Sequence, residues 1–275
     1  MRDGILIIDK PKGITSHDVV AKVRKALKTK KVGHTGTLDP LATGVLIVCV
    51  EKATKLVNHL ICENKTYEVE MKFGIKTDTG DITGNTIKED EEVIIDLQKL
   101  KRVMTSFIGK QKQIPPMYSA IKVNGKKLYE LAREGIEIER EARDIEIYDI
   151  SNIALEGAVL KYKVSCSKGT YVRSLCEDIA EKLGAIATMT NLRRVQTGAF
   201  NIDEAISIED VSAEKIISME KLFDKEINVK NELKKVLNGV KIHYDLPDGL
   251  YKLYADGFIG IGKIENKNLI REIIL

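Results

Sequence analysis

A glycine-rich stretch that runs into an unbroken apolar segment constrains this chain most: residues 33–50, GHTGTLDPLATGVLIVCV. Its glycines allow backbone geometry that side chains would forbid, and Pro40 biases Asp39 toward an extended conformation. The run Val45 to Val50 predicts a buried strand, although so short an apolar run is also compatible with a helix. His34 lies five residues before Asp39. The spacing alone leaves two interpretations, a structural turn with a solvated Asp39 or a rigid loop that presents a carboxylate for chemistry.

Length and composition bound the class of protein. The 275 residues suffice for one large domain or two unequal ones, and 43% hydrophobic with 31% charged residues is typical of a soluble globular chain. No apolar stretch approaches the roughly 20 residues of a membrane span, and the N-terminus lacks the pattern of a signal peptide. We therefore expect a cytoplasmic protein that does not associate with membranes.

The cysteines and histidines do not predict a metal site. The four cysteines form no CxxC pair, and the four histidines show neither HxxxH nor HxE spacing. The cysteines, among them Cys62, are interpreted as reduced and mostly buried thiols.

Basic residues gather in two places although the net charge is only +3. Residues 20–31 carry six basic residues and no acid, and residues 110–127 carry five lysines and no acid. Two such stretches on a nearly neutral chain suggest local contact with a polyanion, whereas either one alone is better explained as a solvated helix face. The second stretch, with two prolines and an Asn124-Gly125 pair, predicts an exposed loop or hairpin followed by a short helix that ends at Gly135.

Local patterns predict a mixture of strands and helices. Residues 66–73, TYEVEMKF, alternate as a half-buried antiparallel strand does, with Tyr67 on the apolar side. Thr15 or Ser16 is expected to cap one helix, and residues 172–183 predict another that ends at Gly184. The chain after Phe200 reads as helical and charged to about residue 225. Residues 227–275 predict a small β-rich domain that packs on the main one, because about 50 residues are marginally stable alone.

The candidate chemistry consists of one acid on a loop, a nearby histidine, an arginine and aromatic side chains. Arg173 falls in the first turn of its predicted helix, where a cation is unfavourable for the helix dipole, so it either has a specific partner or is simply exposed. A lone carboxylate can act as a nucleophile or a general base, and an arginine would keep it ionised and aimed. Aromatic side chains and arginine beside a basic groove suit a flipped nucleobase.

Five blocks of the sequence, in order and at consistent spacing, together with GHTGTLDP, resemble the tRNA pseudouridine-55 synthases, which isomerise one uridine in the T loop of tRNA. They cover most of residues 4–200 and read ILIIDKPKGITSHDVV, NKTYEVEMKFGIKTDTGD, QIPPMYSAIKVNGKKLYELAREG, SCSKGTYVRSLCEDIA and LRRVQTGAF. The resemblance implies the fold of that family: an α+β fold with a mixed, largely antiparallel central sheet flanked by helices, and a small C-terminal β-rich domain. We place the catalytic domain at 1–226, with an RNA-gripping insertion at about 109–135, and a small domain similar to PUA RNA-binding domains at 227–275.

The resemblance also implies roles for individual residues. Asp39 matches the catalytic aspartate, Arg173 the arginine paired with it, and Tyr67 the tyrosine that stacks on the target base and is placed for proton transfer. Tyr171 and Leu192 match pocket residues around the flipped nucleotide, and His34 matches a histidine that contacts the RNA. The substrate implied is the T arm of tRNA. The rearrangement involves neither redox nor phosphoryl transfer, so no cofactor or metal is implied, and the protein is expected to be a monomer.

Two other hypotheses stay open. One is the catalytic subunit of a guide-RNA-dependent pseudouridylation complex, whose central motif is similar. The short N-terminus, the small C-terminal domain and the insertion at 109–135 count against it, so no guide RNA is expected. The other is a non-catalytic tRNA-binding or tRNA-folding protein. The joint presence of Asp39, Tyr67 and Arg173 argues against loss of activity.

Overall fold

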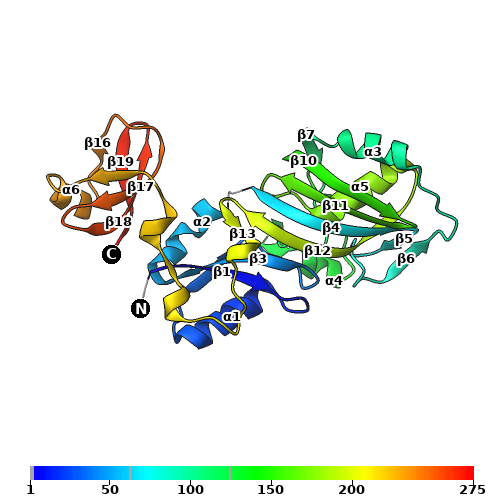
Figure 1. The fold of residues 1–275 in the computed structure, drawn as a ribbon, viewed down its shortest axis with the longest axis horizontal. Coiled ribbons are helices and arrows are strands. Elements are labelled where there is room, and N and C mark those ends of the chain that lie inside the picture. Colours follow the sequence, from blue (N-terminus) through cyan, green and yellow to red (C-terminus); the bar gives the residue numbers. More distant parts are fainter. Residues whose placement is uncertain (1–2, 62–63, 124) are drawn as a thin grey trace.

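One ten-stranded sheet organises most of the molecule (Figure 1). The computed structural model describes residues 3–61, 64–123 and 125–275, so Cys62 and Asn124 lie outside the described residues. The main strand order is β14 (Ile217–Ser218), β1 (Gly4–Lys10), β3 (Thr43–Val50), β12 (Ala187–Thr197), β4 (Lys65–Phe73), β11 (Val159–Cys166), β10 (Arg143–Glu156) and β7 (Gly109–Gln113). In addition β2 (Val32–Thr35) pairs with β3, and β13 (Phe200–Asn201) pairs with β12.

Strand β3 explains why residues 45–50 read as a continuous apolar run. Both of its faces are covered, because Val45, Ile47 and Cys49 enter one hydrophobic cluster and Leu46, Val48 and Val50 enter another on the opposite side. A strand buried on both faces needs no polar alternation. The predicted buried strand is therefore confirmed.

In the half of the sheet formed by β12, β4, β11 and β10, helices cover one face. The apolar sides of β4, β10, β11 and β12 form one cluster with α3 (Leu97–Thr105) and α5 (Val172–Leu183). The register of β4 agrees with the predicted alternation: Tyr67 and Val69 are buried in this cluster, while Glu68 is exposed. Helix α5 ends at Gly184, whose φ of 78° is the left-handed geometry that glycine adopts at little cost.

The capped N-terminal helix is also confirmed. Helix α1 (Ser16–Leu27) begins after Thr15, whose side chain accepts a hydrogen bond from the Asp18 N–H, while Asp18 accepts one from the Thr15 N–H. This reciprocal capping box satisfies two donors that the first turn would otherwise leave unpaired. The basic residues Lys22, Arg24, Lys25 and Lys28 are exposed, away from the apolar side of the helix.

The expectation of helical structure after Phe200 was wrong. Residues 202–225 form short 3-10 turns η2 (Ile202–Glu204), η3 (Ala213–Lys215) and η4 (Met219–Leu222) with the two-residue strand β14. The backbone follows the sheet instead of coiling: the Ile206 N–H donates to the Ile7 carbonyl, and the Asp9 N–H donates to the Ile206 carbonyl. The apolar residues of the segment, including Ile208 and Ile216, cover the sheet beside α1. Their spacing therefore reflects an extended chain rather than a helix face.

A second sheet forms the C-terminal part of the chain, red and orange in Figure 1. Its order is β15 (Glu226–Asn228), β17 (Gly249–Tyr254), β18 (Phe258–Glu265), β19 (Asn268–Ile274) and β16 (Ile242–His243), with the short helix α6 (Leu233–Leu237) beside it. Ile261 and Ile273 of this sheet share a hydrophobic cluster with Ala53 and Leu56 of the turn η1 (Glu51–Leu56), which precedes α2 (Val57–Leu60). The small sheet thus packs on the main domain, as its size required.

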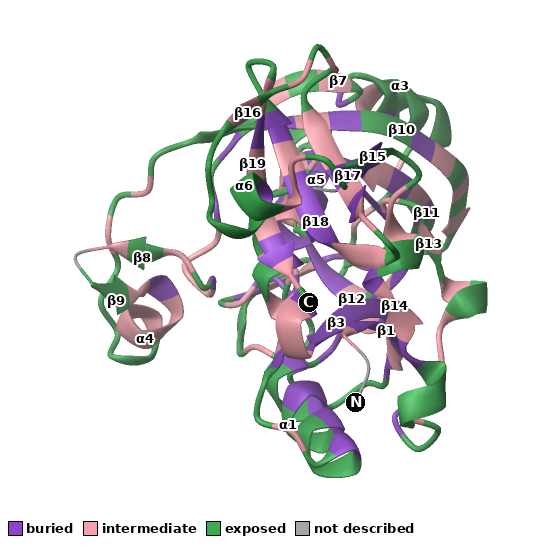
Figure 2. Ribbon diagram, turned by 90° about the vertical axis from the view of Figure 1, so that its left-hand side faces the viewer, coloured by how far each residue is buried: buried purple, intermediate pink, exposed green. Residues whose placement is uncertain are grey.

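Two small hairpins project from the main sheet. One joins β5 (Ile75–Thr77) to β6 (Thr86–Glu89), and the other joins β8 (Lys122–Val123) to β9 (Lys126–Lys127). The second hairpin is followed by α4 (Leu128–Arg133), and Gly135 then adopts a φ of 73°. Figure 2 shows α4, β8 and β9 standing away from the body of the molecule. The predicted exposed insertion with its short helix is confirmed, and Asn124 of its predicted turn lies outside the described residues.

The two halves of the main sheet meet where β12 runs parallel to β3. The pairing consists of Arg193 with Thr43 and Arg194 with Gly44, and we call these two residue pairs the seam. Gly44 has a φ of 101°, and a Cβ atom there would lie 2.2 Å from the Arg194 carbonyl oxygen. Only glycine allows so close an approach of two backbones.

Replacing Gly44 with alanine is therefore expected to destabilise the protein strongly, because a left-handed backbone and a clash act together. We expect a loss of more than about 2 kcal/mol in the free energy of unfolding, measured by chemical denaturation. Gly169→Ala is the matched control, since Gly169 has a φ of 82° but nothing within 4 Å of an added Cβ. The control should lose only about 1 kcal/mol. Equal losses in the two variants would contradict the close approach at the seam.

Candidate functional site

Asp39 lies in the loop of residues 36–42, between β2 and β3, and we call this the Asp39 loop. The loop is tied down by Ser16 at the start of α1, whose buried hydroxyl accepts from the Leu38 N–H at 2.9 Å and donates to the Leu38 carbonyl at 3.1 Å. The Ala42 N–H closes a turn onto the Asp39 carbonyl at 3.0 Å. The Asp39 side chain itself remains 37% exposed. A carboxylate that is accessible on a fixed loop can meet a substrate without rearrangement.

Arg173 is buried and reaches this carboxylate. Its Nη2 lies 3.0 Å from Asp39 Oδ2, although only 6% of the arginine side chain is exposed. Nη1 donates to the Thr79 carbonyl at 2.8 Å, and Nη2 donates to the Tyr118 carbonyl at 2.7 Å. These partners explain why a cation is tolerated in the first turn of α5. The interpretation of Arg173 as an exposed residue is excluded.

A second carboxylate, Asp81, holds the far side of the same guanidinium. Its Oδ2 lies 4.0 Å from Arg173 Nε, and the residue is 5% exposed. Oδ1 accepts from the Thr83 N–H at 2.9 Å and from the Thr79 hydroxyl at 3.3 Å. Sequence reasoning missed Asp81, because the stretch that contains it reads as a polar hairpin turn. Its burial comes from the docking of that turn against β12, where Asp81 bridges to Met189.

Aromatic and aliphatic side chains pack against the Asp39 loop. Tyr67 on β4 is 8% exposed and Leu192 on β12 is 7% exposed, and both belong to the cluster that includes Leu38 of the Asp39 loop. Burial raises the pKa of Tyr67 and of Tyr171, and the negative charge of Asp39 adds to both shifts. Both phenols are therefore protonated at neutral pH and lie within electrostatic reach of Asp39.

Tyr171 is placed by its backbone. It precedes α5 as the N-cap residue, and its N–H donates to Gln113 Oε1 at 2.8 Å while its carbonyl accepts from Gln113 Nε2 at 3.1 Å. Gln113 ends β7 at the base of the insertion. Because Arg173 also binds the Tyr118 carbonyl, the insertion is fastened to the same side of the sheet as the ion pair.

Lys10 is a further cation that sequence reasoning did not select. It ends β1, its side chain is fully buried, and its Nζ donates to the carbonyls of Pro11 and Ile14 at 2.9 and 2.7 Å. Burial lowers the pKa of Lys10 to about 8, and Asp39 opposes this shift. The only sequence signal was the Lys-Pro-Lys-Gly turn, which reads as exposed.

His34 lies on β2, opposite Val48 of β3, at the entrance to the Asp39 loop. Its ring packs edge-on against His17 of α1, with ring centres 5.3 Å apart. Burial lowers the pKa of His34 to about 4, and the neighbouring His17 and Arg194 add to this shift. Nδ1 is buried without a hydrogen-bond partner among the described residues. The imidazole is therefore neutral at physiological pH.

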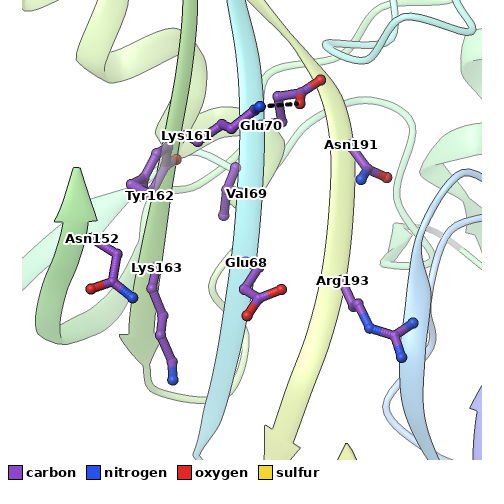
Figure 3. A pocket seen from close by; sticks show the side chains of 9 residues that line it. All are labelled: Glu68, Val69, Glu70, Asn152, Lys161, Tyr162, Lys163, Asn191 and Arg193. Carbon is purple, nitrogen blue, oxygen red and sulfur yellow. Dashed lines mark ion pairs between the residues drawn. The ribbon is translucent and has the colours of Figure 1, made fainter. Parts of the chain in front are cut away.

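The opposite face of the sheet carries a separate hollow (Figure 3). Its volume is about 340 Å³, and polar side chains such as Glu68, Lys163 and Arg193 line it. A 3.9 Å ion pair joins Lys161 to Glu70 across it. Because Glu68 alternates with Tyr67 along β4, this hollow faces away from Asp39. It is not the candidate active site.

Within the described residues, no group of three or more His, Cys, Asp or Glu side chains is arranged to hold a metal ion. The described helices include none long and apolar enough to cross a membrane. Cys49, Cys166 and Cys176 are buried free thiols, as predicted for them.

Comparison with known proteins identifies the class of enzyme. Residues 24–172 match the domain described as TruB family pseudouridylate synthase (N terminal domain). Residues 173–241 match the tRNA pseudouridylate synthase B C-terminal domain. The fold and these matches therefore define a pseudouridylate synthase. The chain belongs to the TruB family.

Curated relatives support this assignment over nearly the full length. A protein of Clostridium perfringens (strain 13 / Type A) named tRNA pseudouridine synthase B is 47% identical, covering 99% of both chains. A protein of the same name from Fusobacterium nucleatum is 45% identical, covering 98% of both.

Solved structures share the fold. A Cbf5-Nop10-Gar1 complex contains a chain that is 27% identical, with a TM-score of 0.72, covering 100% of this chain and 84% of that one. An H/ACA RNP bound to a substrate RNA contains a chain that is 25% identical, with a TM-score of 0.70, covering 98% of this chain and 83% of that one. The predicted α+β fold with its largely antiparallel sheet is confirmed.

The depressed pKa of His34 predicts a pH dependence of stability. As pH falls, the unfolded imidazole takes up a proton near 6.5, while the folded one does so only near 4. The folded state binds fewer protons in this window, so acidification from about 6.5 to 4 should destabilise it. His34→Gln should reduce that loss in the free energy of unfolding, measured by urea denaturation across the window. His243→Gln, at an exposed position, is the control, and an undiminished loss in His34→Gln would contradict the assignment.

Proposed function

We propose that this protein converts uridine 55 in the T loop of tRNA to pseudouridine, without a guide RNA. Membership of the TruB family supports pseudouridine synthesis, and the name of its 47% identical relatives supports tRNA as the substrate. The observation that carries the site assignment is the 3.0 Å ion pair between accessible Asp39 and buried Arg173. It supports Asp39 as the catalytic group and Arg173 as the residue that aims it.

Docking of the T arm is assigned to the exposed cations. Lys22, Arg24 and Lys25 on α1, and Lys110, Lys112, Lys122 and Lys126 in and beside the insertion, are exposed. Contacts from such side chains to phosphates fix the register of an RNA without reading its sequence. We assign the projecting insertion to gripping the T arm, and residues 227–275 to a PUA-like RNA-binding domain beside the catalytic domain of residues 1–226. One chain carries all of these parts, so the protein is proposed to act as a monomer.

The target uridine then leaves the stack, at a cost of a few kcal/mol. We assign Tyr67 to stacking on the flipped base, Leu192 and Tyr171 to the walls of the pocket, and His34 to a neutral contact with the RNA. Asp39 acts on the nucleotide, the N1–C1′ bond breaks, and the freed uracil turns so that C5 bonds to C1′. C5 loses a proton and N1 gains one, so the isomerisation balances without an oxidant or a second substrate. The protonated hydroxyl of Tyr67 is assigned to this proton transfer.

Guide-dependent and guide-free action can be distinguished directly. Purified protein is incubated with an unmodified tRNA transcript alone, and pseudouridine is mapped along the transcript. The proposal expects modification at the T-loop uridine. Product that appears only after addition of a guide RNA would support the guide-dependent alternative, and tRNA binding without product would support a non-catalytic RNA-binding protein.

Asp39→Asn tests the catalytic assignment. The amide has the same shape as the carboxylate but neither its charge nor its basicity, so turnover should fall below detection while tRNA affinity, measured by filter binding, stays within about threefold. Asp78→Asn, in the polar hairpin turn, is a matched control and should retain activity. Full turnover in Asp39→Asn would remove Asp39 from this role.

Tyr67→Phe separates stacking from proton transfer. The ring remains and the hydroxyl is lost, so tRNA binding should be retained while the single-turnover rate falls by about 10²-fold, the usual contribution of a positioned proton-transfer group. Tyr148→Phe, at an exposed position on β10, should leave the rate unchanged. A wild-type rate in Tyr67→Phe would restrict Tyr67 to a stacking platform.

A further inference from the structure

Arg194 is buried more completely than its charge would lead one to expect. It is 1% exposed, and it is among the largest fully buried side chains of the described chain. Removing a guanidinium from water costs several kcal/mol unless its donors find partners. Here the partners are informative, because they lie on either side of Asp39 in the sequence, at Gly36 and at Val45.

The side chain spans the Asp39 loop. Nε donates to the Val45 carbonyl at 2.7 Å, at the start of β3, and Nη2 donates to the Gly36 carbonyl at 3.0 Å, just after β2. Asp39 lies between these two carbonyls in the sequence. A planar fork with fixed donor directions can hold two acceptors at a set separation, which a flexible ammonium cannot do. Through its side chain, Arg194 therefore links the start of the Asp39 loop to β3.

The backbone of Arg194 fixes the same region. Arg194 pairs with Gly44 at the seam and with Tyr67 across β12 and β4. Its charge and hydrogen bonding also lower the pKa of Tyr67, against the larger rise that burial causes. One residue thus touches the Asp39 loop on one side and the proposed stacking tyrosine on the other.

We propose that Arg194 is a positioning residue for the reaction: it sets the Asp39 loop and the Tyr67 hydroxyl in register with each other across the seam. The proposal rests on the proposed function. Arg194 has no role in contacting RNA, because it is buried beneath both groups. Its loss should therefore slow the chemical step and leave tRNA binding largely intact.

Arg194→Lys keeps the positive charge but removes the planar guanidinium and its fixed donor directions. We expect the single-turnover rate to fall by about 30-fold or more, with the Kd for tRNA within about threefold, because a displacement near 1 Å at a reacting group costs on the order of 10²-fold. Arg193→Lys is the matched control. Arg193 is the next residue on β12, points to the opposite face, and binds Asp9 with its Nη2 2.8 Å from Asp9 Oδ2; its rate should stay within about twofold of wild type.

A double-mutant cycle distinguishes positioning from general destabilisation. If Arg194 acts partly through Tyr67, Arg194→Lys should cost clearly less in the Tyr67→Phe background than in wild type. Equal costs in both backgrounds, or a wild-type rate in Arg194→Lys, would overturn the proposal. Hydrogen exchange supplies a readout without activity: amides of residues 37–43 should exchange faster in Arg194→Lys, while those of α3 should not.

If Arg194→Lys does not fold, Arg194→Gln takes its place, because the single amide nitrogen of its shorter side chain cannot replace the two nitrogens that bind the Val45 and Gly36 carbonyls. A wild-type hydrogen-exchange pattern in the loop of whichever variant folds would overturn the proposal. If wild-type protein makes no pseudouridine, the proposed function fails by itself, and the loop exchange still reports whether Arg194 holds the Asp39 loop.

Discussion

The contact between Asp39 and Arg173 is the interaction on which the arrangement of the site depends. A guanidinium buried in a folded protein must find acceptors, and Arg173 finds them on three other segments: the Asp39 loop, the hairpin turn with Thr79 and Asp81, and the insertion at Tyr118. Leaving such a charge without its partners would be strongly destabilising. The need to satisfy one cation therefore helps to hold these three segments together beside α5.

Two other buried cations beneath the Asp39 loop must also find acceptors. Arg194 and Lys10 are buried cations whose donors are directed at backbone carbonyls. Those of Arg194 flank Asp39 in the sequence, and those of Lys10 lie in the turn whose Gly13 N–H donates to the Pro40 carbonyl. Backbone acceptors do not vary with side-chain substitution, so they give a fixed frame for the accessible carboxylate above them. The backbone around Asp39 is thereby fixed, while its side chain remains 37% exposed.

Much of the fold could be predicted from local pattern because local physics determines it. The alternation of residues 66–73, the capping box at Thr15 and Asp18, and the stop at Gly184 each depend on near neighbours in sequence. The stretch 202–225 could not be predicted in this way. Its backbone forms hydrogen bonds with β1, about 200 residues earlier, and its local sequence contains no signal for that partner. The site divides similarly. Asp39 was marked by its glycines and proline, and family resemblance supplied Arg173 and Tyr67, whereas Asp81, Lys10 and Arg194 derive their importance from burial that only tertiary structure creates.

The seam between β3 and β12 has a consequence for the order of folding. Thr43 and Arg193 are 150 residues apart in the chain, and bringing such distant positions together costs entropy that local elements do not incur. The hairpin of β10 and β11 can form from residues that are near neighbours in sequence, and so can the helices that precede and follow it. We therefore expect the two residue pairs of the seam to join late. The Asp39 loop belongs to one side of this junction and Tyr67 to the other. A chain that is still folding would then have its separate parts without a working pocket, and reactivity toward RNA would arise only once this long-range junction had formed.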